Sequence, residues 1–103
     1  MEYIADKCLS LLKNIFEKDN IVLHDKDKSY QGSWKKRGGV GAFMMLCRKW
    51  DRIEVTVKSH NYDIFEAYKK DIRLETLRDD IQDLRRYLAL IEAEMIDQLN
   101  DDC

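Results

Sequence analysis

The stretch LETLRDDIQDLRRYLALIEAEM, residues 74–95, decides the fold class. Its large apolar residues are separated alternately by three and four positions. They are Leu74, Leu77, Ile81, Leu84, Leu88, Ile91 and Met95. Such a heptad seam follows one face of a helix and packs against another helix. The partner is either a helix of the same chain or a second copy that forms a homo-oligomer, and the two arrangements can coexist.

Helical spacing also dominates the rest of the chain. We expect a first helix over residues 2–19 that ends at Asn20, then an extended or turned apolar run at 21–23 and a polar loop at 25–29. A second helix is expected over residues 39–57. A short third helix follows, with Ile64, Phe65 and Tyr68 on it. The sequence therefore predicts an all-α protein, a compact three- to four-helix bundle that forms a single domain over residues 1–103.

Composition excludes several classes of protein. The chain has 103 residues, of which 45% are hydrophobic and 37% charged, and it contains no proline. No apolar run approaches the ~18 residues that a membrane span requires. The start of the chain lacks the basic and apolar regions of a signal peptide. Cys8, Cys47 and Cys103 have no metal-type spacing. We expect reduced thiols in a cytoplasmic protein of a bacterial host cell, with no membrane partner.

Charge is distributed unevenly along the chain. The formal net charge is −2. Residues 1–27 carry four Lys and six acids, residues 28–58 carry eight cations and two acids, and residues 59–103 carry six cations and twelve acids. The middle segment is thus a basic island between acidic flanks, which either attracts an anionic ligand or forms a solvated surface. The acidic C-terminal part makes a long nucleic acid a less suitable partner than a small anion.

The basic island contains a glycine-rich stretch that suits phosphate. Lys35, Lys36 and Arg37 precede the glycines at positions 38, 39 and 41. Gly39 lets the backbone approach a ligand, and a helix that starts at such a loop offers free N–H groups to an anion. The stretch lacks the ending of a P-loop, and no clear strand precedes it as in a dinucleotide fold. The alternative is a flexible loop whose cations serve solubility.

Aromatic and basic neighbours extend this candidate site. Tyr30 and Trp34 can stack a base while nearby cations hold its phosphate. Trp34 can equally be a core residue. Arg48 and Arg52 share one helix face and either extend the phosphate site or form ion pairs on the helix surface. The predicted ligand-binding residues are Tyr30, Trp34, Lys35, Lys36, Arg37, Gly39, Arg48 and Arg52.

Two pairs of acids define an alternative chemistry. Asp51 and Glu54 share a face of the second helix, and Asp80 and Asp83 share a face of the last one. If the helices face each other, the four carboxylates can bind Mg²⁺ and position a water molecule. With twelve acids in the last 45 residues, such spacings also arise by chance. Binding alone requires no cofactor, whereas catalysis by this route requires Mg²⁺.

The turn Ser29-Tyr30-Gln31-Gly32-Ser33-Trp34, the helix around Lys49-Trp50-Asp51-Arg52 and the stretch Leu77–Tyr87 together carry a resemblance. Over residues 25–95 the chain resembles small phage and bacterial proteins of the nucleotide-modification-associated domain family, first type. The resemblance implies a role that involves nucleotides and does not define a reaction. The two acid pairs are more weakly similar to the Mg²⁺-binding residues of MazG-like all-α nucleoside triphosphate pyrophosphohydrolases.

Three functions follow as hypotheses. The favoured one is a phage-type protein without catalytic residues that binds a phosphorylated nucleotide, a sponge that sequesters nucleotide immune signals, cyclic ones included, in anti-defence. The second is a Mg²⁺-dependent pyrophosphohydrolase or an accessory protein of nucleotide or base modification. The third is a nucleic-acid or protein adaptor. His24 and His60 have no partner in a nucleophile motif, so we assign neither to catalysis.

Overall fold

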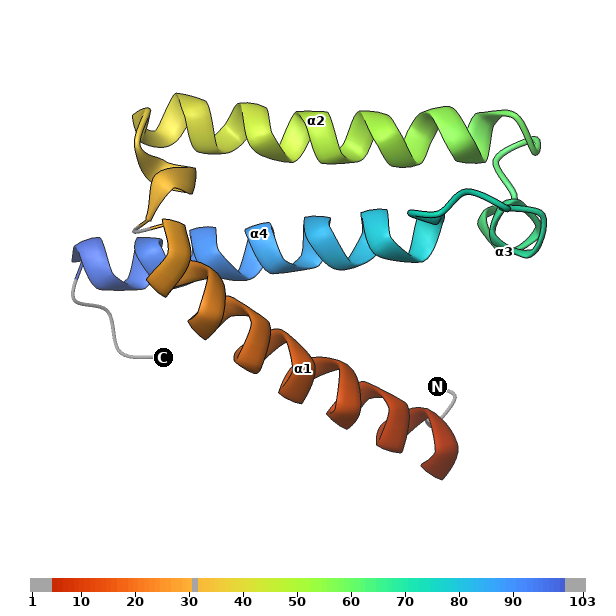
Figure 1. The fold of residues 1–103 in the computed structure, drawn as a ribbon, viewed down its shortest axis with the longest axis horizontal. Helices are drawn as coiled ribbons and strands as arrows, with labels where there is room; N and C mark the ends of the chain where they lie inside the picture. Colours follow the sequence, from red (N-terminus) through yellow and green to blue (C-terminus); the bar gives the residue numbers. More distant parts are fainter. Residues whose placement is uncertain (1–4, 31, 100–103) are drawn as a thin grey trace. The chain divides into compact units, whose positions relative to one another are not determined.

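The computed structural model describes residues 5–30 and 32–99, and these residues form helices without strands (Figure 1). The elements are α1 (Asp6–Tyr30), the 3₁₀ helix η1 (Ser33–Lys35), α2 (Gly38–Lys58), α3 (Ile64–Lys69) and α4 (Leu77–Leu99). The all-α prediction is confirmed. Within the described ranges, no helix is both long and apolar enough to cross a membrane. The chain separates into two compact units, residues 1–33 and residues 34–103.

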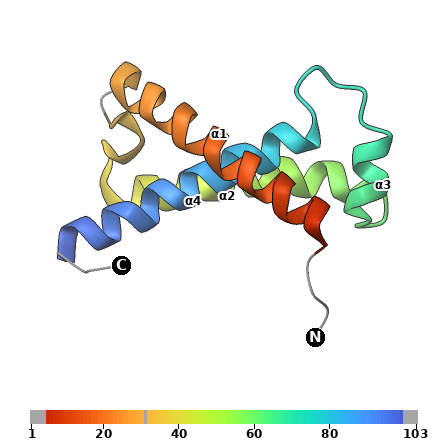
Figure 2. The same ribbon diagram turned by 90° about the horizontal axis from the view of Figure 1, so that it is seen from below.

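The first unit contains α1, which is longer than predicted. It continues through Asn20 as one helix to Tyr30 (Figure 2), so the predicted end at Asn20, the extended run at 21–23 and the loop at 25–29 are wrong. No glycine or proline occurs between its ends, and the helix penalty of a single Asn is well below 1 kcal/mol. Local polarity was therefore a poor signal for a helix end.

The second unit is a helical hairpin. Helices α2 and α4 run antiparallel side by side, and α3 lies in the connection between them (Figure 1). The buried core consists of Ile53, Val57, Ala67 and Leu77, with Ile64 and Leu84 packed against it. The second and third predicted helices are confirmed, because α2 begins and ends within one residue of the expected range and α3 contains Ile64, Phe65 and Tyr68.

The heptad seam of α4 is divided into two rows. Leu77 is buried and Leu84 packs on the core, and with half-buried Ile91 they form the row at seven-residue spacing that α2 covers. The intervening row consists of Ile81, Leu88 and Met95, which stay exposed. The hairpin therefore uses only half of the predicted seam.

The first residue of the predicted seam lies outside α4. Leu74 is fully exposed in the connection, so the prediction that the helix includes it is wrong. The Thr76 N–H and Oγ1–H both donate to Oδ2 of Asp79, at 2.8 and 3.2 Å. This capping arrangement satisfies groups at the start of α4 and begins the helix after Thr76.

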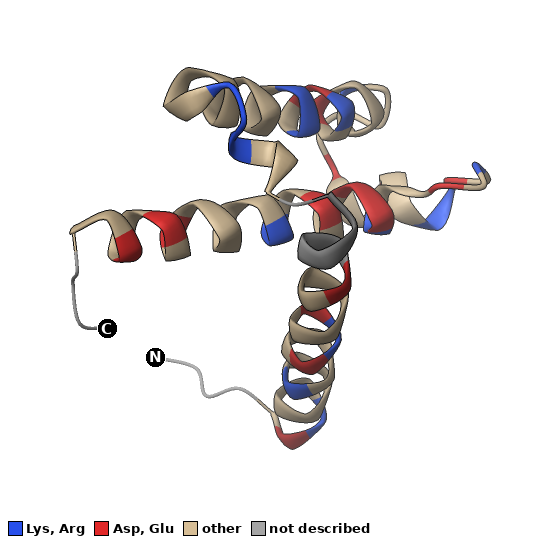
Figure 3. Cartoon of the chain, turned by 60° about the vertical axis from the view of Figure 1, so that its left-hand side comes forward, with Lys and Arg blue, Asp and Glu red and all other residues tan. Residues whose placement is uncertain are grey.

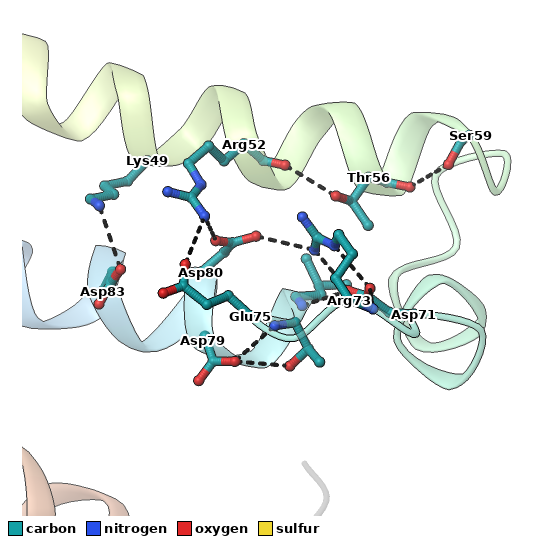
Figure 4. Close-up of polar contacts among 12 residues, drawn as sticks. Lys49, Arg52, Thr56, Ser59, Asp71, Arg73, Glu75, Asp79, Asp80 and Asp83 are labelled. Atoms are coloured by element: carbon teal, nitrogen blue, oxygen red, sulfur yellow. Dashed lines mark hydrogen bonds and ion pairs between the residues drawn. The ribbon is translucent and has the colours of Figure 1, made fainter.

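A second carboxylate secures the connection into α4. The side chain of Asp71 is only 3% exposed and accepts the Leu77 N–H at 2.7 Å (Figure 4). The Arg73 guanidinium donates two hydrogen bonds to the same carboxylate, at 2.9 and 2.7 Å, and also lies 3.3 Å from Asp80. The hydrogen bonds from Arg73 hold the pKa of Asp71 well below its ordinary value of 3.8. A charged Asp71 thus ties the connection to the first turn of α4.

Stability is expected to fall in acid because of Asp71. A carboxylate whose pKa is lower in the folded state stabilises the fold above its ordinary pKa, and the contribution is lost as the pH falls below about 4. We expect Asp71→Asn to lower the melting temperature at neutral pH and to reduce its further decrease in acid. Thermal unfolding followed by circular dichroism between neutral and acidic pH measures both. Asp97→Asn, at an exposed position of α4, is the control. Equal acid sensitivity in Asp71→Asn and the unmodified chain would contradict this role.

Candidate functional site

The predicted ligand residues fall at separate places on the chain. Tyr30 is the last residue of α1, and its side chain lies outside the described part of the structure. In the second unit, a pocket of about 330 Å³ lies between the start of α2 and the end of α4; we call it the helix-start pocket. A second pocket of about 460 Å³ lies farther along α2, against Tyr87 of α4; we call it the basic pocket.

The helix-start pocket combines two aromatic rings with open backbone. Trp34 and Phe43 line it beside Gly38 and Gly39, and Ile91 and other side chains of α4 form the opposite wall. A Cβ atom built at Gly39 would meet nothing within 4 Å, so the first turn of α2 is open to a ligand. Trp34 and Gly39, two of the predicted ligand-binding residues, thus line the same pocket.

Among the described residues, no side chain caps the start of α2 with a hydrogen bond. Arg37 is the N-cap residue, its side chain makes no capping hydrogen bond, and the first turn contains no acid. The first N–H groups of an α-helix lack partners within the helix, and the helix dipole makes this end positive. Gly38 begins the helix with a φ of +73°, in the region that favours glycine. This geometry suits an anion.

Glycine at position 41 is required for a different reason. A Cβ atom there would lie 2.7 Å from Cβ of Arg37, closer than side-chain carbons approach each other. The glycines therefore belong mainly to the first turns of α2, and the irregular part of the predicted basic loop is confined to the turn at Lys36 and Arg37. The glycines allow the residues of this turn to pack closely against the start of α2.

The three adjacent cations differ in their surroundings. Lys35 forms an ion pair with Glu94 of α4, and its Nζ lies 6.0 Å from the centre of the Trp34 ring. Hydrogen bonds from Lys35 and Gln98 lower the pKa of the Glu94 carboxyl. Lys36 and Arg37 are exposed in the turn that precedes α2. Figure 3 shows the Lys and Arg positions of the chain in blue. Lys35 thus holds the wall of the pocket, while the next two cations face solvent beside it.

The basic pocket is lined by cations that acids partly neutralise. Arg48, Lys49 and Arg52 line it together with Asp51 and Tyr87. The Nζ of Lys49 lies 5.7 Å from the centre of the Tyr87 ring. Lys49 and Tyr87 were absent from the predicted site. The position of the Tyr87 ring beside Lys49 depends on how α2 and α4 pack.

Three of the four candidate metal ligands, Asp80, Asp83 and Glu54, are engaged in other interactions. One carboxylate oxygen of buried Asp80 lies 3.2 Å from a guanidinium nitrogen of Arg52, and the other oxygen lies 3.3 Å from a guanidinium nitrogen of Arg73 (Figure 4). Arg52 also lies 3.4 Å from Glu75. Asp83 lies 3.4 Å from Lys49 in a second ion pair between α4 and α2.

The carboxylates do not gather around a common point. Glu54 accepts a hydrogen bond from Nε1 of Trp50 at 3.3 Å, and Asp51 lines the basic pocket. Among the residues that the structure describes, no group of three His, Cys, Asp or Glu side chains is arranged to hold a metal ion. Asp80 and Asp83 therefore serve as partners of Arg and Lys in this arrangement, and Glu54 as an acceptor for Trp50.

Comparison with known proteins adds nothing to this geometry. No protein-family model matches the chain, and no curated protein or solved structure is significantly similar to it. The resemblance to the nucleotide-modification-associated family stays a prediction. Function has to be inferred from the two pockets and the groups that line them.

The ion pairs of Asp80 predict a structural role for this residue. We expect Asp80→Asn to lower the free energy of unfolding by about 2 kcal/mol, since it leaves two guanidinium groups without their buried acceptor while both stay partly hydrated. This corresponds to a decrease in melting temperature of roughly 10 °C. Asp51→Asn, in the basic pocket, is the matched control and should change stability by less than about 0.5 kcal/mol. Equal melting temperatures for the two variants would contradict the assignment.

Proposed function

We propose that this protein binds a phosphorylated nucleotide in the helix-start pocket and holds it unchanged. One observation carries the proposal: an aromatic pocket lies directly beside an uncapped helix start that is flanked by exposed cations. A nucleotide has the same two parts, a flat base and an anionic phosphate. The pocket volume of about 330 Å³ is near the lower end of the range for small-molecule sites, which suits one base.

The base would occupy the apolar part of the pocket. Trp34 and Phe43 offer ring faces, and stacking on an aromatic side chain contributes about 1–3 kcal/mol per base. Ala42 and Leu46 line the same pocket and exclude water around the base. Stacking alone tolerates every base, so specificity would come from polar groups at the edge, of which Gln98 is one.

The phosphate would lie against the first turn of α2. Backbone N–H groups at this end point toward an anion, and the dipole adds a favourable field. Lys36 and Arg37 are close enough in sequence to reach the same phosphate, and the fork of a guanidinium fits its oxygens. Lys35 contributes indirectly, because its ion pair with Glu94 holds the wall on which the base rests.

Arg48 and Arg52 do not line the helix-start pocket. Arg48 is nine residues along α2 from Gly39, about 14 Å at the rise of an α-helix. Arg52 is engaged by Asp80 and Glu75. The arginines would instead line a separate basic pocket, and Arg48 becomes a useful control for binding.

Binding without turnover is favoured over hydrolysis. A Mg²⁺-dependent pyrophosphohydrolase needs converging carboxylates, whereas Asp80 and Asp83 pair with Arg and Lys side chains. Sequestration of a nucleotide signal, cyclic or linear, is the role that we therefore propose. The hydrolase remains the second candidate and rests on the spacing of the acid pairs.

A panel of linear and cyclic nucleotides tests the proposal. The protein is incubated with the panel and Mg²⁺, filtered and denatured, and both fractions are analysed by mass spectrometry. We expect one nucleotide to disappear from the filtrate and to return unchanged on denaturation. New products in the filtrate would indicate an enzyme and replace the proposal with the hydrolase. Retention of no nucleotide would reject both.

Single substitutions locate the site once a nucleotide is retained. We expect Arg37→Ala and Trp34→Ala each to weaken binding by about 10- to 100-fold, because each removes a charge-assisted contact or a stacking surface. Isothermal titration calorimetry measures the affinities. Arg48→Ala is the matched control and should leave affinity within about threefold of the unmodified protein. If Arg48→Ala weakened binding as much as Arg37→Ala, the ligand would occupy the basic pocket instead.

A further inference from the structure

The α4 wall of the helix-start pocket carries hydrogen-bond acceptors. Glu94 and Gln98 both line the pocket and are four positions apart, so they share one face of α4. The Glu94 side chain is 21% exposed. Its Oε1 accepts from Nζ of Lys35, and its Oε2 accepts from Nε2 of Gln98 at 3.0 Å. The other end of the Gln98 amide is a carbonyl oxygen, which is a further acceptor.

The Glu94 carboxylate keeps acceptor capacity for a ligand. An ionised carboxylate has about four lone-pair sites, and within the described residues this one receives hydrogen bonds from Lys35 and Gln98. The same two hydrogen bonds lower the pKa of the Glu94 carboxyl, so the group is charged at neutral pH and can only accept. About two sites therefore remain for donors of a molecule in the pocket.

Paired acceptors of this kind distinguish one base from the others. Guanine has two adjacent donors on one edge, N1–H and the N2 amino group. Adenine and cytosine instead place an acceptor nitrogen beside their amino group, and uracil has a single N–H between two carbonyl groups. A carboxylate accepts both donors of guanine at once, whereas it repels the ring-nitrogen lone pair of adenine or cytosine.

The two walls of the pocket match the two ends of a guanine nucleotide. The sugar and phosphate are attached at N9, on the other side of the base from the N1 and N2 edge. In the proposed site the phosphate lies at the first turn of α2, and Glu94 belongs to α4, which forms the opposite wall. The base would therefore stack beside Trp34 with its donor edge toward Glu94.

We propose that the helix-start pocket selects guanine, with the carboxylate of Glu94 accepting hydrogen bonds from N1–H and from the N2 amino group. This inference rests on the proposed function, because it names the base that the same site takes. Glu94 determines specificity, and Lys35 and Gln98 hold its carboxylate through their hydrogen bonds.

Three bases compared on the same phosphate test the selection. Isothermal titration calorimetry measures the affinity of the full chain for guanosine, inosine and adenosine monophosphates, each as the 5′ and the 3′,5′-cyclic form. Inosine differs from guanosine only in lacking the N2 amino group. We expect the guanosine form to bind about 10- to 100-fold more tightly than the adenosine form and about tenfold more tightly than the inosine form. Equal affinity for the three bases would overturn the guanine proposal and leave the proposed function standing, whereas no binding of any nucleotide would overturn both.

A substitution at Glu94 separates base selection from support of the pocket wall. Glu94→Gln keeps the shape of the side chain but replaces one acceptor oxygen by an amino donor, so the preference for guanosine over adenosine should fall to within about threefold. Lys35→Met is the matched control, because it removes the same ion pair and leaves the carboxylate. It should weaken both nucleotides alike and keep the preference within about threefold of the unmodified value. Far-UV circular dichroism confirms that both variants keep their helices. An unchanged preference in Glu94→Gln would overturn the proposal.

Discussion

The carboxylate of Asp80 lies almost completely buried, and guanidinium groups from α2 and from the connection after α3 approach its two oxygens. A buried charge is tolerated only when it is paired, so this contact fixes the register of α4 against α2 and the path of the connection together. Arg73 also forms an ion pair with Asp71, and Asp71 accepts a hydrogen bond from the Leu77 N–H in the first turn of α4. The small apolar core of the hairpin therefore forms beside an ionic network that defines one arrangement.

The same network determines which charged groups remain available for a ligand. Arg52, Lys49 and Lys35 of the basic island all form ion pairs with acids that follow α2 in the chain. The acidic C-terminal part thus neutralises much of the island from within. The part of the island that stays exposed and basic includes the turn at Lys36 and Arg37, which precedes a helix whose first turn has no side-chain cap. An anion would be attracted to this turn more than to the rest of the island.

Sequence periodicity predicted the helices of the hairpin because packing against a partner imposes it. It located α2, α3 and most of α4, and it failed where a helix end depends on local hydrogen bonds. The cap at Thr76 excludes Leu74 from α4, although Leu74 fits the heptad. Among the site residues, Trp34 and Gly39 line the same pocket, which is understandable because they are only five positions apart in the sequence. The separate position of Arg48, and the pairing of Asp80 with two arginines, depend on which faces of α2 and α4 meet, which spacing within one helix does not determine.

The division of the heptad seam depends on the same ion pair of Asp80. A helix with apolar residues at every three and four positions presents a stripe wider than one neighbour covers, and in this chain α2 covers only the row that begins at Leu77. Because Asp80 fixes how α4 is rotated against α2, it also fixes which row faces outward. The ion pair that stabilises the hairpin therefore leaves Leu88 on the face of α4 that is turned away from α2.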